Sequence, residues 1–161
     1  MDTNSSSNLT KLIDIGISLS REKNIDILLE KILKEARIIS NSDGGTVYLI
    51  SNNDTKLKFK IMHNESLGIN FGGSANPVPE SIYPVRLYNQ DNTKNLNNVS
   101  AVCALEKRTI NIKDAYKDEQ FDFSGTKGFD EKHNYYSKSF LTIPLKNHKD
   151  KVIGVLQLLN A

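Results

Sequence analysis

The chain has 161 residues, of which 38% are apolar and 25% are charged, and its formal net charge is +2. These proportions are typical of one globular domain with a buried core, and they exclude a wholly disordered chain and an integral membrane protein. Because basic and acidic residues alternate along the whole sequence, no concentrated cationic face is expected, and nucleic acid is not an expected partner. The single cysteine excludes an internal disulfide and a multi-cysteine metal cluster.

The first 39 residues predict a short disordered segment followed by two helices. Residues 1–8 are polar, and the apolar residues after them are too interrupted for a signal peptide or a membrane span, so we expect a cytoplasmic protein. In residues 9–39 apolar side chains recur at three- and four-residue spacing, which predicts two helices that meet near residues 21–24. Asn24 is the expected N-cap of the second helix, and the polar, glycine-containing residues 40–45 end it.

Both predicted helices also carry apolar residues outside their main stripes. These are Ile15, Leu19, Ile27 and Ile38. They either belong to the core or form a second apolar face that pairs with another subunit. The second alternative predicts a homodimer formed through the N-terminal helices.

The next part of the chain predicts a hairpin and then irregular structure. Residues 46–50 and 57–62 read as strands around the turn at residues 51–54, and the second strand alternates apolar residues with lysine. Residues 64–98 are rich in Asn, Gly, Pro and Ser, which predicts mostly irregular chain with a short strand near residues 85–88. Residues 99–105 then predict a short helix, capped by Asn97 or Asn98, and residues 108–112 a strand.

The last forty residues predict a loop in front of a sheet. Residues 121–137 are polar and aromatic, and a loop of this length predicts a lid or a pocket wall. Residues 139–145 and 152–159 predict two strands joined by a polar turn. The second of these strands is apolar at nearly every position, with Gly154 and Gln157 as the exceptions, so both of its faces should be covered. With helices on one face, loops must roof the other, which predicts a pocket there.

Few residues suggest covalent chemistry. The three histidines are far apart in sequence and none belongs to a zinc-binding pair, so no metal is expected. Cys103 has no neighbouring histidine or second cysteine to activate it. Asp130 and Glu131 could form an acid–base pair, although adjacent carboxylates are more typical of a helix start. The polar side chains of residues 130–137 are better suited to hydrogen-bonding a ligand, or form only a solvated lid.

Several motifs together resemble the GAF domain, a sensory module of cyclic-nucleotide phosphodiesterases, adenylyl cyclases and bacterial signalling proteins. They are NIKDAY at 111–116, FDFSG at 121–125, LTIPLKNH at 141–148 and VIGVLQL at 152–158, and the resemblance covers residues 9–161. It implies an α+β fold, with an antiparallel sheet, the N-terminal helices on one face and a loop-roofed ligand pocket on the other. The FDFSG segment is similar to GAF domains that precede HD-GYP phosphohydrolase or cyclase output domains.

The resemblance also implies a set of ligand-binding positions. They are Thr46, Met62, His63, Val99, Ser100, Tyr116, Asp130, His133 and Ser137. Two features depart from cyclic-nucleotide-binding members. Met62 and His63 stand where those members carry a base-stacking aromatic residue, and Asn160 is followed by Ala161 rather than by lysine and a closing helix. The closing C-terminal helix is therefore expected to be missing from this piece of a longer protein.

Three functions remain open from the sequence. The first is a regulatory domain that senses a small ligand, such as a cyclic nucleotide, and controls an attached phosphodiesterase- or cyclase-type output domain. The second is a ligand-free dimerisation module. The third is a small enzyme such as a free methionine sulfoxide reductase, but that chemistry uses more than one cysteine. A covalent bilin chromophore is not expected, because Cys103 is followed by Ala104 rather than by histidine.

Overall fold

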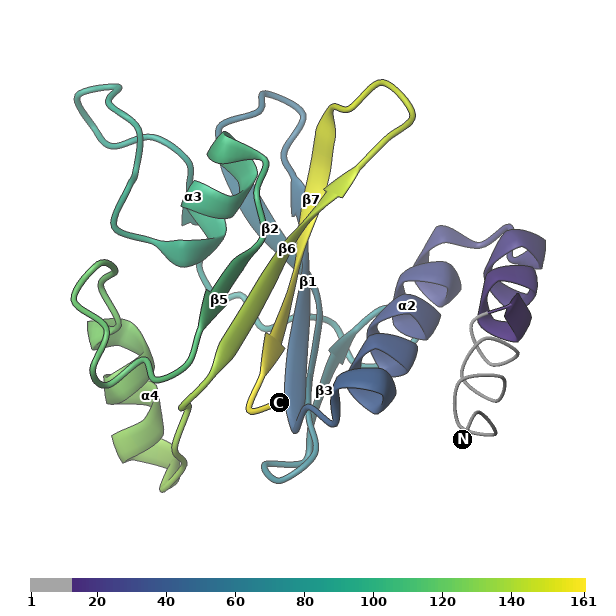
Figure 1. The fold of residues 1–161 in the computed structure, drawn as a ribbon, viewed down its shortest axis with the longest axis horizontal. Coiled ribbons are helices and arrows are strands. Elements are labelled where there is room, and N and C mark those ends of the chain that lie inside the picture. Colours follow the sequence, from purple (N-terminus) through teal and green to yellow (C-terminus); the bar gives the residue numbers. More distant parts are fainter. Residues whose placement is uncertain (1–12) are drawn as a thin grey trace, which may run out of the picture.

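The computed structural model describes residues 13–161. The predicted disorder of residues 1–8 and the first turn of the first helix lie outside the described residues. A helix over residues 13–21 comes first. The following elements are α2 (Ile25–Ser40), β1 (Gly44–Ile50), β2 (Lys56–Asn64), β3 (Ile69–Gly72), β4 (Val85–Arg86), α3 (Val99–Glu106), β5 (Ile110–Ile112), α4 (Ser124–His133), β6 (Phe140–Lys146) and β7 (Val152–Leu159) (Figure 1).

The centre of the molecule is one antiparallel sheet. Its strand order is β3-β2-β1-β7-β6-β5, and the short strand β4 pairs with β2. β1 and β7 lie side by side in the middle, with Gly44 opposite Leu159 and Thr46 opposite Gln157. This arrangement confirms the predicted α+β class, in which helices and loops cover an antiparallel sheet.

The helix α2 covers one face of the sheet. Leu29 and Leu33 are its buried residues. They pack against apolar side chains of β1, β2 and β7, namely Val47, Ile61, Leu156 and Leu158. The predicted N-cap is confirmed, since Asn24 Oδ1 accepts a hydrogen bond of 2.9 Å from the N–H of Asp26. The helix ends at Asn41, which adopts a left-handed conformation with φ 53°.

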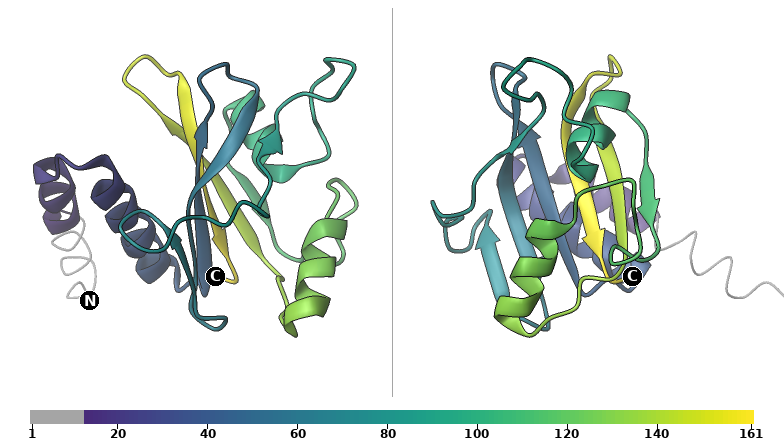
Figure 2. Two further views of the ribbon diagram at one scale, coloured as in Figure 1. Left: turned by 180° about the vertical axis from the view of Figure 1, so that it is seen from behind. Right: turned by 90° about the vertical axis from the view of Figure 1, so that its left-hand side faces the viewer.

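The other face of the sheet is covered by α3, α4 and the long connections (Figure 2). All residues of α3 from Val99 to Ala104 are buried. The N-cap of α3 is Asn98, whose Oδ1 accepts a hydrogen bond from the N–H of Ala101. In β7, Val155 belongs to the core under α3, whereas Leu156 and Leu158 belong to the core under α2. The prediction that both faces of this strand are covered is therefore confirmed.

Two predicted irregular segments contain regular structure. The strand β3 lies within residues 64–98, and the helix α4 lies within residues 121–137, where the sequence predicts a loop. α4 contains Gly125 and Gly128, and its N-cap residue, Phe123, has no side chain that could cap the helix. Because glycine weakens a helix by about 1 kcal/mol relative to alanine, local preference alone does not indicate this helix. Tertiary contacts described below hold it in place.

No helix in the described part of the chain is both long and apolar enough to cross a bilayer.

Candidate functional site

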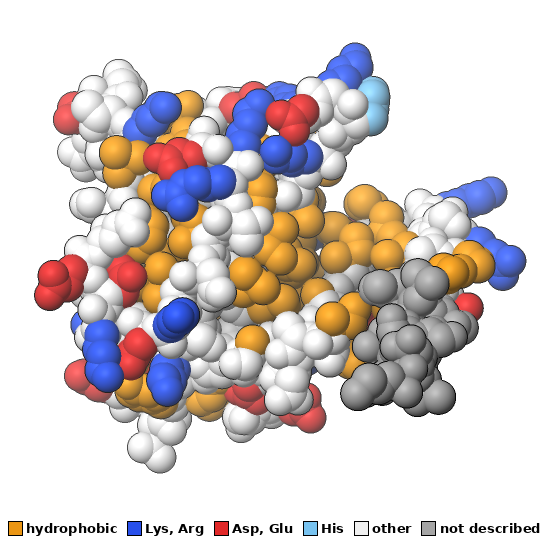
Figure 3. Space-filling model, in the orientation of Figure 1, with side chains coloured by type: hydrophobic (Ala, Val, Ile, Leu, Met, Phe, Trp, Pro, Cys, Tyr) orange, Lys and Arg blue, Asp and Glu red, His pale blue; other side chains and the backbone are white. Residues whose placement is uncertain are grey.

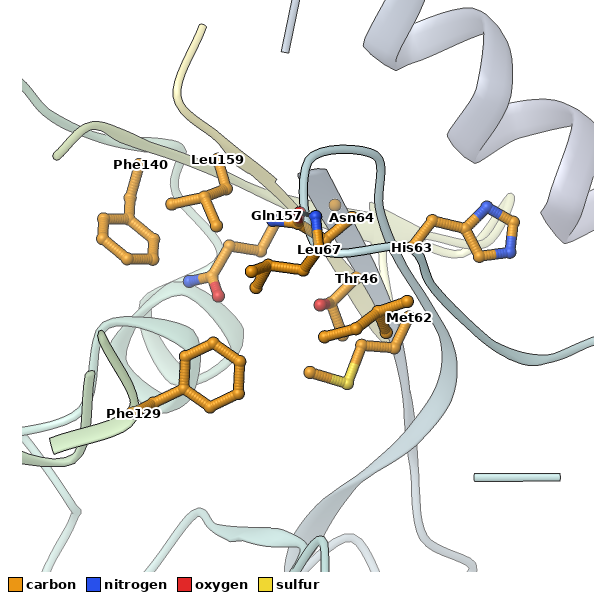
Figure 4. Close-up of a pocket in the computed structure, with 11 residues that line it drawn as sticks. Thr46, Met62, His63, Asn64, Leu67, Phe129, Phe140, Gln157 and Leu159 are labelled. Atoms are coloured by element: carbon orange, nitrogen blue, oxygen red, sulfur yellow. Dashed lines mark hydrogen bonds between the residues drawn. The ribbon is translucent and has the colours of Figure 1, made fainter. Parts of the chain in front are cut away.

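A small cavity lies between the sheet and α4. Its volume is about 60 Å³. The residues that line it come from five strands, the turn after β2 and α4: Gly45, Thr46, Met62, His63, Asn64, Leu67, Ile69, Phe129, Phe140, Gln157 and Leu159 (Figure 4). In the close-up, Phe129 faces the cavity from α4, opposite Thr46 and Met62 on the strands.

The register of the sheet places three of these side chains together. Thr46 on β1 pairs with Met62 on β2 and with Gln157 on β7. Since directly paired residues of neighbouring strands point to the same face of a sheet, the three side chains form a row across the cavity floor.

Gln157 connects the cavity to α3. Its Nε2 donates hydrogen bonds to Ser100 Oγ at 3.2 Å and to Thr142 Oγ1 at 3.1 Å. Its Oε1 accepts a longer bond of 3.4 Å from the Tyr48 hydroxyl. Thr142 is fully buried, and burial raises the pKa of Tyr48 to about 12, so this polar cluster sits in the core beneath the cavity.

The carboxylate of Asp130 holds the end of α4. This side chain is only 2% exposed. Its oxygens accept hydrogen bonds of 2.7 Å from the Tyr116 hydroxyl, the Ser137 N–H and the Ser137 hydroxyl. The bond to Asp130, assisted by burial, raises the pKa of Tyr116 to about 12. Asp130 is also the one buried residue of α4, so these bonds are the main attachment of the helix.

The predicted site residues fall into several groups. Thr46 and Met62 line the cavity directly. Tyr116, Asp130 and Ser137 come together in the cluster that holds α4 and do not line the cavity. Val99 and Ser100 are buried in the first turn of α3, where Ser100 reaches the cavity only through Gln157.

Neither histidine of the predicted set places its ring in the cavity wall. His63 follows Met62 on the same strand, and its ring is directed away from the other lining side chains (Figure 4). Burial, with a smaller contribution from the Arg37 guanidinium, lowers the pKa of His63. His133 is exposed and stacks on Phe129 with ring centroids 4.1 Å apart.

The predicted set omits most of the cavity wall. The missing residues are Gly45, Asn64, Leu67, Ile69, Phe129, Phe140, Gln157 and Leu159. One of them had a signal in the sequence, because Gln157 is a polar residue inside a strand that is otherwise apolar and buried on both faces. The others come from segments whose placement depends on the tertiary fold.

Cys103 is a buried residue of α3 that packs into the core between this helix and the sheet, and it does not line the cavity. Burial raises the pKa of its thiol to about 12. We expect a thiol-specific reagent at pH 8 to label the folded protein about a hundredfold or more slowly than the unfolded chain, because the thiolate is the reactive form. Labelling rates with and without urea measure this difference. Equal rates would contradict the assignment of Cys103 as a structural residue, as would loss of ligand binding in Cys103→Ala.

Within residues 13–161, no three His, Cys, Asp or Glu side chains are grouped so that they could hold a metal ion.

This chain is similar to known proteins in both sequence and fold. The sequence model of the GAF domain matches residues 24–161. The cGMP-specific 3',5'-cyclic phosphodiesterases of Drosophila mojavensis and Drosophila melanogaster are 26% identical to this chain over 145 residues. These matches cover 88% of this chain, which spans only 12% of the length of those two proteins.

Solved structures with the same fold include two of different activity. The GAF domain of an Acinetobacter phosphoenolpyruvate-protein phosphotransferase has a TM-score of 0.64 and 18% identity, over 94% of this chain and 75% of its own. A free methionine-R-sulfoxide reductase from Neisseria meningitidis has a TM-score of 0.62 and 13% identity, over 92% of this chain and 70% of its own. At such low identity, the likeness concerns the fold alone.

Proposed function

This chain belongs to the GAF domain family, and from that premise we propose that it is a regulatory domain that senses a small molecule. The ligand binds in the cavity beneath α4, and its binding biases an output domain in a longer protein. The observation that carries the proposal is a cavity between a rigid sheet and a helix with a single buried residue, Asp130. A helix attached in this way is suited to move when the cavity is filled.

We assign the predicted residues to different roles at this site. Thr46 and Met62 contact the ligand. Tyr116, Asp130 and Ser137 position α4, while Val99 and Ser100 support the cavity floor through Gln157. His63 and His133 lie at the margins of the site, where the surroundings of their rings change with the positions of α2 and α4.

The identity of the output domain is a further part of this proposal. The curated relatives are named as cGMP-specific phosphodiesterases, which supports an output domain of phosphodiesterase type. The resemblance of the FDFSG segment keeps an HD-GYP or cyclase domain in this proposal as alternative outputs, and we propose a cytoplasmic location for the protein. The name of the relatives also makes cyclic GMP a candidate ligand. The lining of the cavity does not favour cyclic GMP, because the described residues around it include no lysine or arginine that could pair with the phosphate.

Native mass spectrometry of the protein purified from cells tests the sensing function. We expect a fraction of the protein to carry a bound molecule that is released on denaturation. Thr46→Val and Phe129→Ala should lower that fraction, whereas the exposed-site variant Lys149→Ala should not. A protein that never retains a molecule, in either variant or parent, would contradict ligand sensing and favour the ligand-free dimerisation module.

We further propose that the domain forms a homodimer through its N-terminal helices. Ile25, Ile38 and Ile39 of α2 are 58%, 62% and 63% exposed. In Figure 3 hydrophobic side chains also gather over the hollow between α2 and the sheet. Leu141 and Ile143 of β6 are half-buried and pack against the core under α2. An exposed apolar face of this kind is typical of a surface that contacts another subunit.

Ile38→Glu should weaken the dimer about tenfold or more, because it places a charge in an apolar interface. Ile153→Glu is the matched control, since Ile153 is an exposed isoleucine of β7 rather than of the helices. Sedimentation equilibrium at high micromolar concentration gives the association constants. A strictly monomeric parent, or equal weakening by the two substitutions, would contradict a helix-mediated dimer.

A further inference from the structure

The cavity beneath α4 is chemically neutral. Most of the described side chains that line it are apolar: Met62, Leu67, Ile69, Phe129, Phe140 and Leu159. Its polar members are the hydroxyl of Thr46 and the amides of Asn64 and Gln157, while the ring of His63 points away (Figure 4). No carboxylate, ammonium or guanidinium belongs to the part of the wall that the structure describes.

A charged ligand group would be unpaired inside this cavity. Moving an ion from water into an apolar site costs several kcal/mol unless a partner of opposite charge compensates it. Asp130, the nearest buried charge on α4, already accepts three hydrogen bonds from the protein. The wall therefore favours a neutral molecule over a phosphate or a carboxylate.

Gln157 offers a free acceptor to the cavity. Gln157 Nε2 uses both of its hydrogens, on Ser100 and Thr142. Gln157 Oε1 has only the 3.4 Å bond from Tyr48, so one of its lone pairs remains available. The other polar groups of the described wall are the Thr46 hydroxyl and the Asn64 amide, whose Oδ1 accepts a hydrogen bond of 2.9 Å from the N–H of Leu67. A ligand that donates one hydrogen bond to Gln157 Oε1 complements this part of the wall.

The volume of about 60 Å³ shows how the ligand must enter. An apolar cavity that holds benzene measures about 150 Å³, so a ring fits here only if the wall yields. Phe129 is the movable part of that wall, because it lies on α4, a helix with two glycines and only one buried residue. Displacement of the Phe129 ring would couple ligand entry to the position of α4.

We propose that the ligand of this domain is a small, neutral, mainly apolar ring compound that donates one hydrogen bond to Gln157 Oε1. The inference rests on the proposed sensing function and specifies the chemical class of its ligand. Gln157 and the absence of a charged partner in the described wall would then determine which ligands bind.

NMR titration of the isotope-labelled protein tests this class with four probes: indole, benzothiophene, indole-3-carboxylate and cyclic GMP. Benzothiophene has the shape of indole without its N–H donor, and indole-3-carboxylate adds a negative charge. We expect indole to shift the signals of Thr46, Met62 and the Gln157 side-chain amide. Benzothiophene should bind about fivefold more weakly, which is the usual contribution of one hydrogen bond. The two anions should bind at least tenfold more weakly than indole.

Gln157→Met removes the acceptor and keeps a side chain of similar length. In this variant we expect indole and benzothiophene to bind equally, while Asn147→Ala, a change in the β6–β7 turn, preserves the preference for indole. If Gln157→Met does not fold, the comparison of indole with benzothiophene in the parent protein still tests the hydrogen bond to the ligand. Tighter binding of cyclic GMP or indole-3-carboxylate at the cavity would overturn the neutral class and leave the sensing function standing. A lack of shifts with all four probes would also overturn it, and the co-purified ligand decides the sensing function separately.

Discussion

Replacing Asp130 with alanine is expected to lower the free energy of unfolding by about 3 kcal/mol. The substitution removes three hydrogen bonds to a carboxylate that is 2% exposed, and it leaves the buried Ser137 hydroxyl and N–H without a partner. The same bonds attach α4 to the rest of the domain, so backbone amides of α4 should also exchange faster with solvent. Urea unfolding gives the free energy, and hydrogen exchange reports on the helix.

Asp122→Ala is the matched control for this prediction. Asp122 lies in the same segment and is exposed, and its Oδ1 accepts one hydrogen bond of 2.8 Å from the N–H of Ser124. Its loss should cost no more than about 1 kcal/mol. If the two variants were equally stable, or if exchange in α4 were unchanged in Asp130→Ala, the carboxylate would not be the anchor of the helix.

Leu33→Ala is expected to destabilise the domain by about 3 kcal/mol, since truncating a fully buried leucine leaves a cavity that the surroundings fill only partly. Leu33 is 0% exposed and packs between α2 and the centre of the sheet. Ile38→Ala, on the exposed side of the same helix, should change stability by less than about 0.5 kcal/mol. Urea unfolding of the two variants measures the contrast, and equal losses would mean that α2 does not pack through Leu33.

The close approach of α2 to the sheet provides a second test. A Cβ atom at Gly45 would lie 2.6 Å from Leu33 Cδ1, so Gly45→Ala should be destabilising in the parent protein. In the Leu33→Ala background that clash is gone, and the cost of Gly45→Ala should fall by about 1 kcal/mol or more. A double-mutant cycle measures this coupling. Strictly additive effects would contradict the contact.

The sequence was most informative where periodicity alone determines the element. The continuous apolar run of β7 predicts a strand covered on both faces, as the structure has it. The stripe in α2 and the cap at Asn24 likewise predict that helix and its start. In both cases the local pattern and the tertiary packing favour the same structure. The alternation in β2 predicts a single covered face, and this prediction is wrong. A bulge in the pairing of β1 with β2 switches the faces, so that Leu57 packs in the core under α3 and Ile61 in the core under α2.

The roof of the cavity could not be predicted in the same way. α4 is a helix because Asp130 binds Tyr116 and Ser137, and these contacts exist only after the chain has folded. Its own residues, which include two glycines, favour no helix. Phe129 and Leu67 line the same cavity although they are 62 residues apart in the sequence. No local sequence pattern predicts that two such distant residues lie at one site.

The strand pattern alone distinguishes two of the predicted site residues. Met62 and His63 are neighbours in a strand, and successive side chains of a strand point to opposite faces of a sheet. Their side chains therefore cannot both point into one pocket. The pairing of Met62 with Thr46 places Met62 on the cavity side, so His63 must face the side of α2.

The central pairing of β1 with β7 has a consequence for how the domain folds. Gly44 lies opposite Leu159, so the middle of the sheet joins the first strand of the chain to the last. Such distant pairings form slowly, and a chain emerging from the ribosome cannot complete the sheet until β7 has been made. Because Gln157 and Leu159 of β7 form part of the cavity wall, the binding site arises only in the final stage of folding. A ligand would then slow unfolding without accelerating folding, and its effect would be seen in the lifetime of the native state.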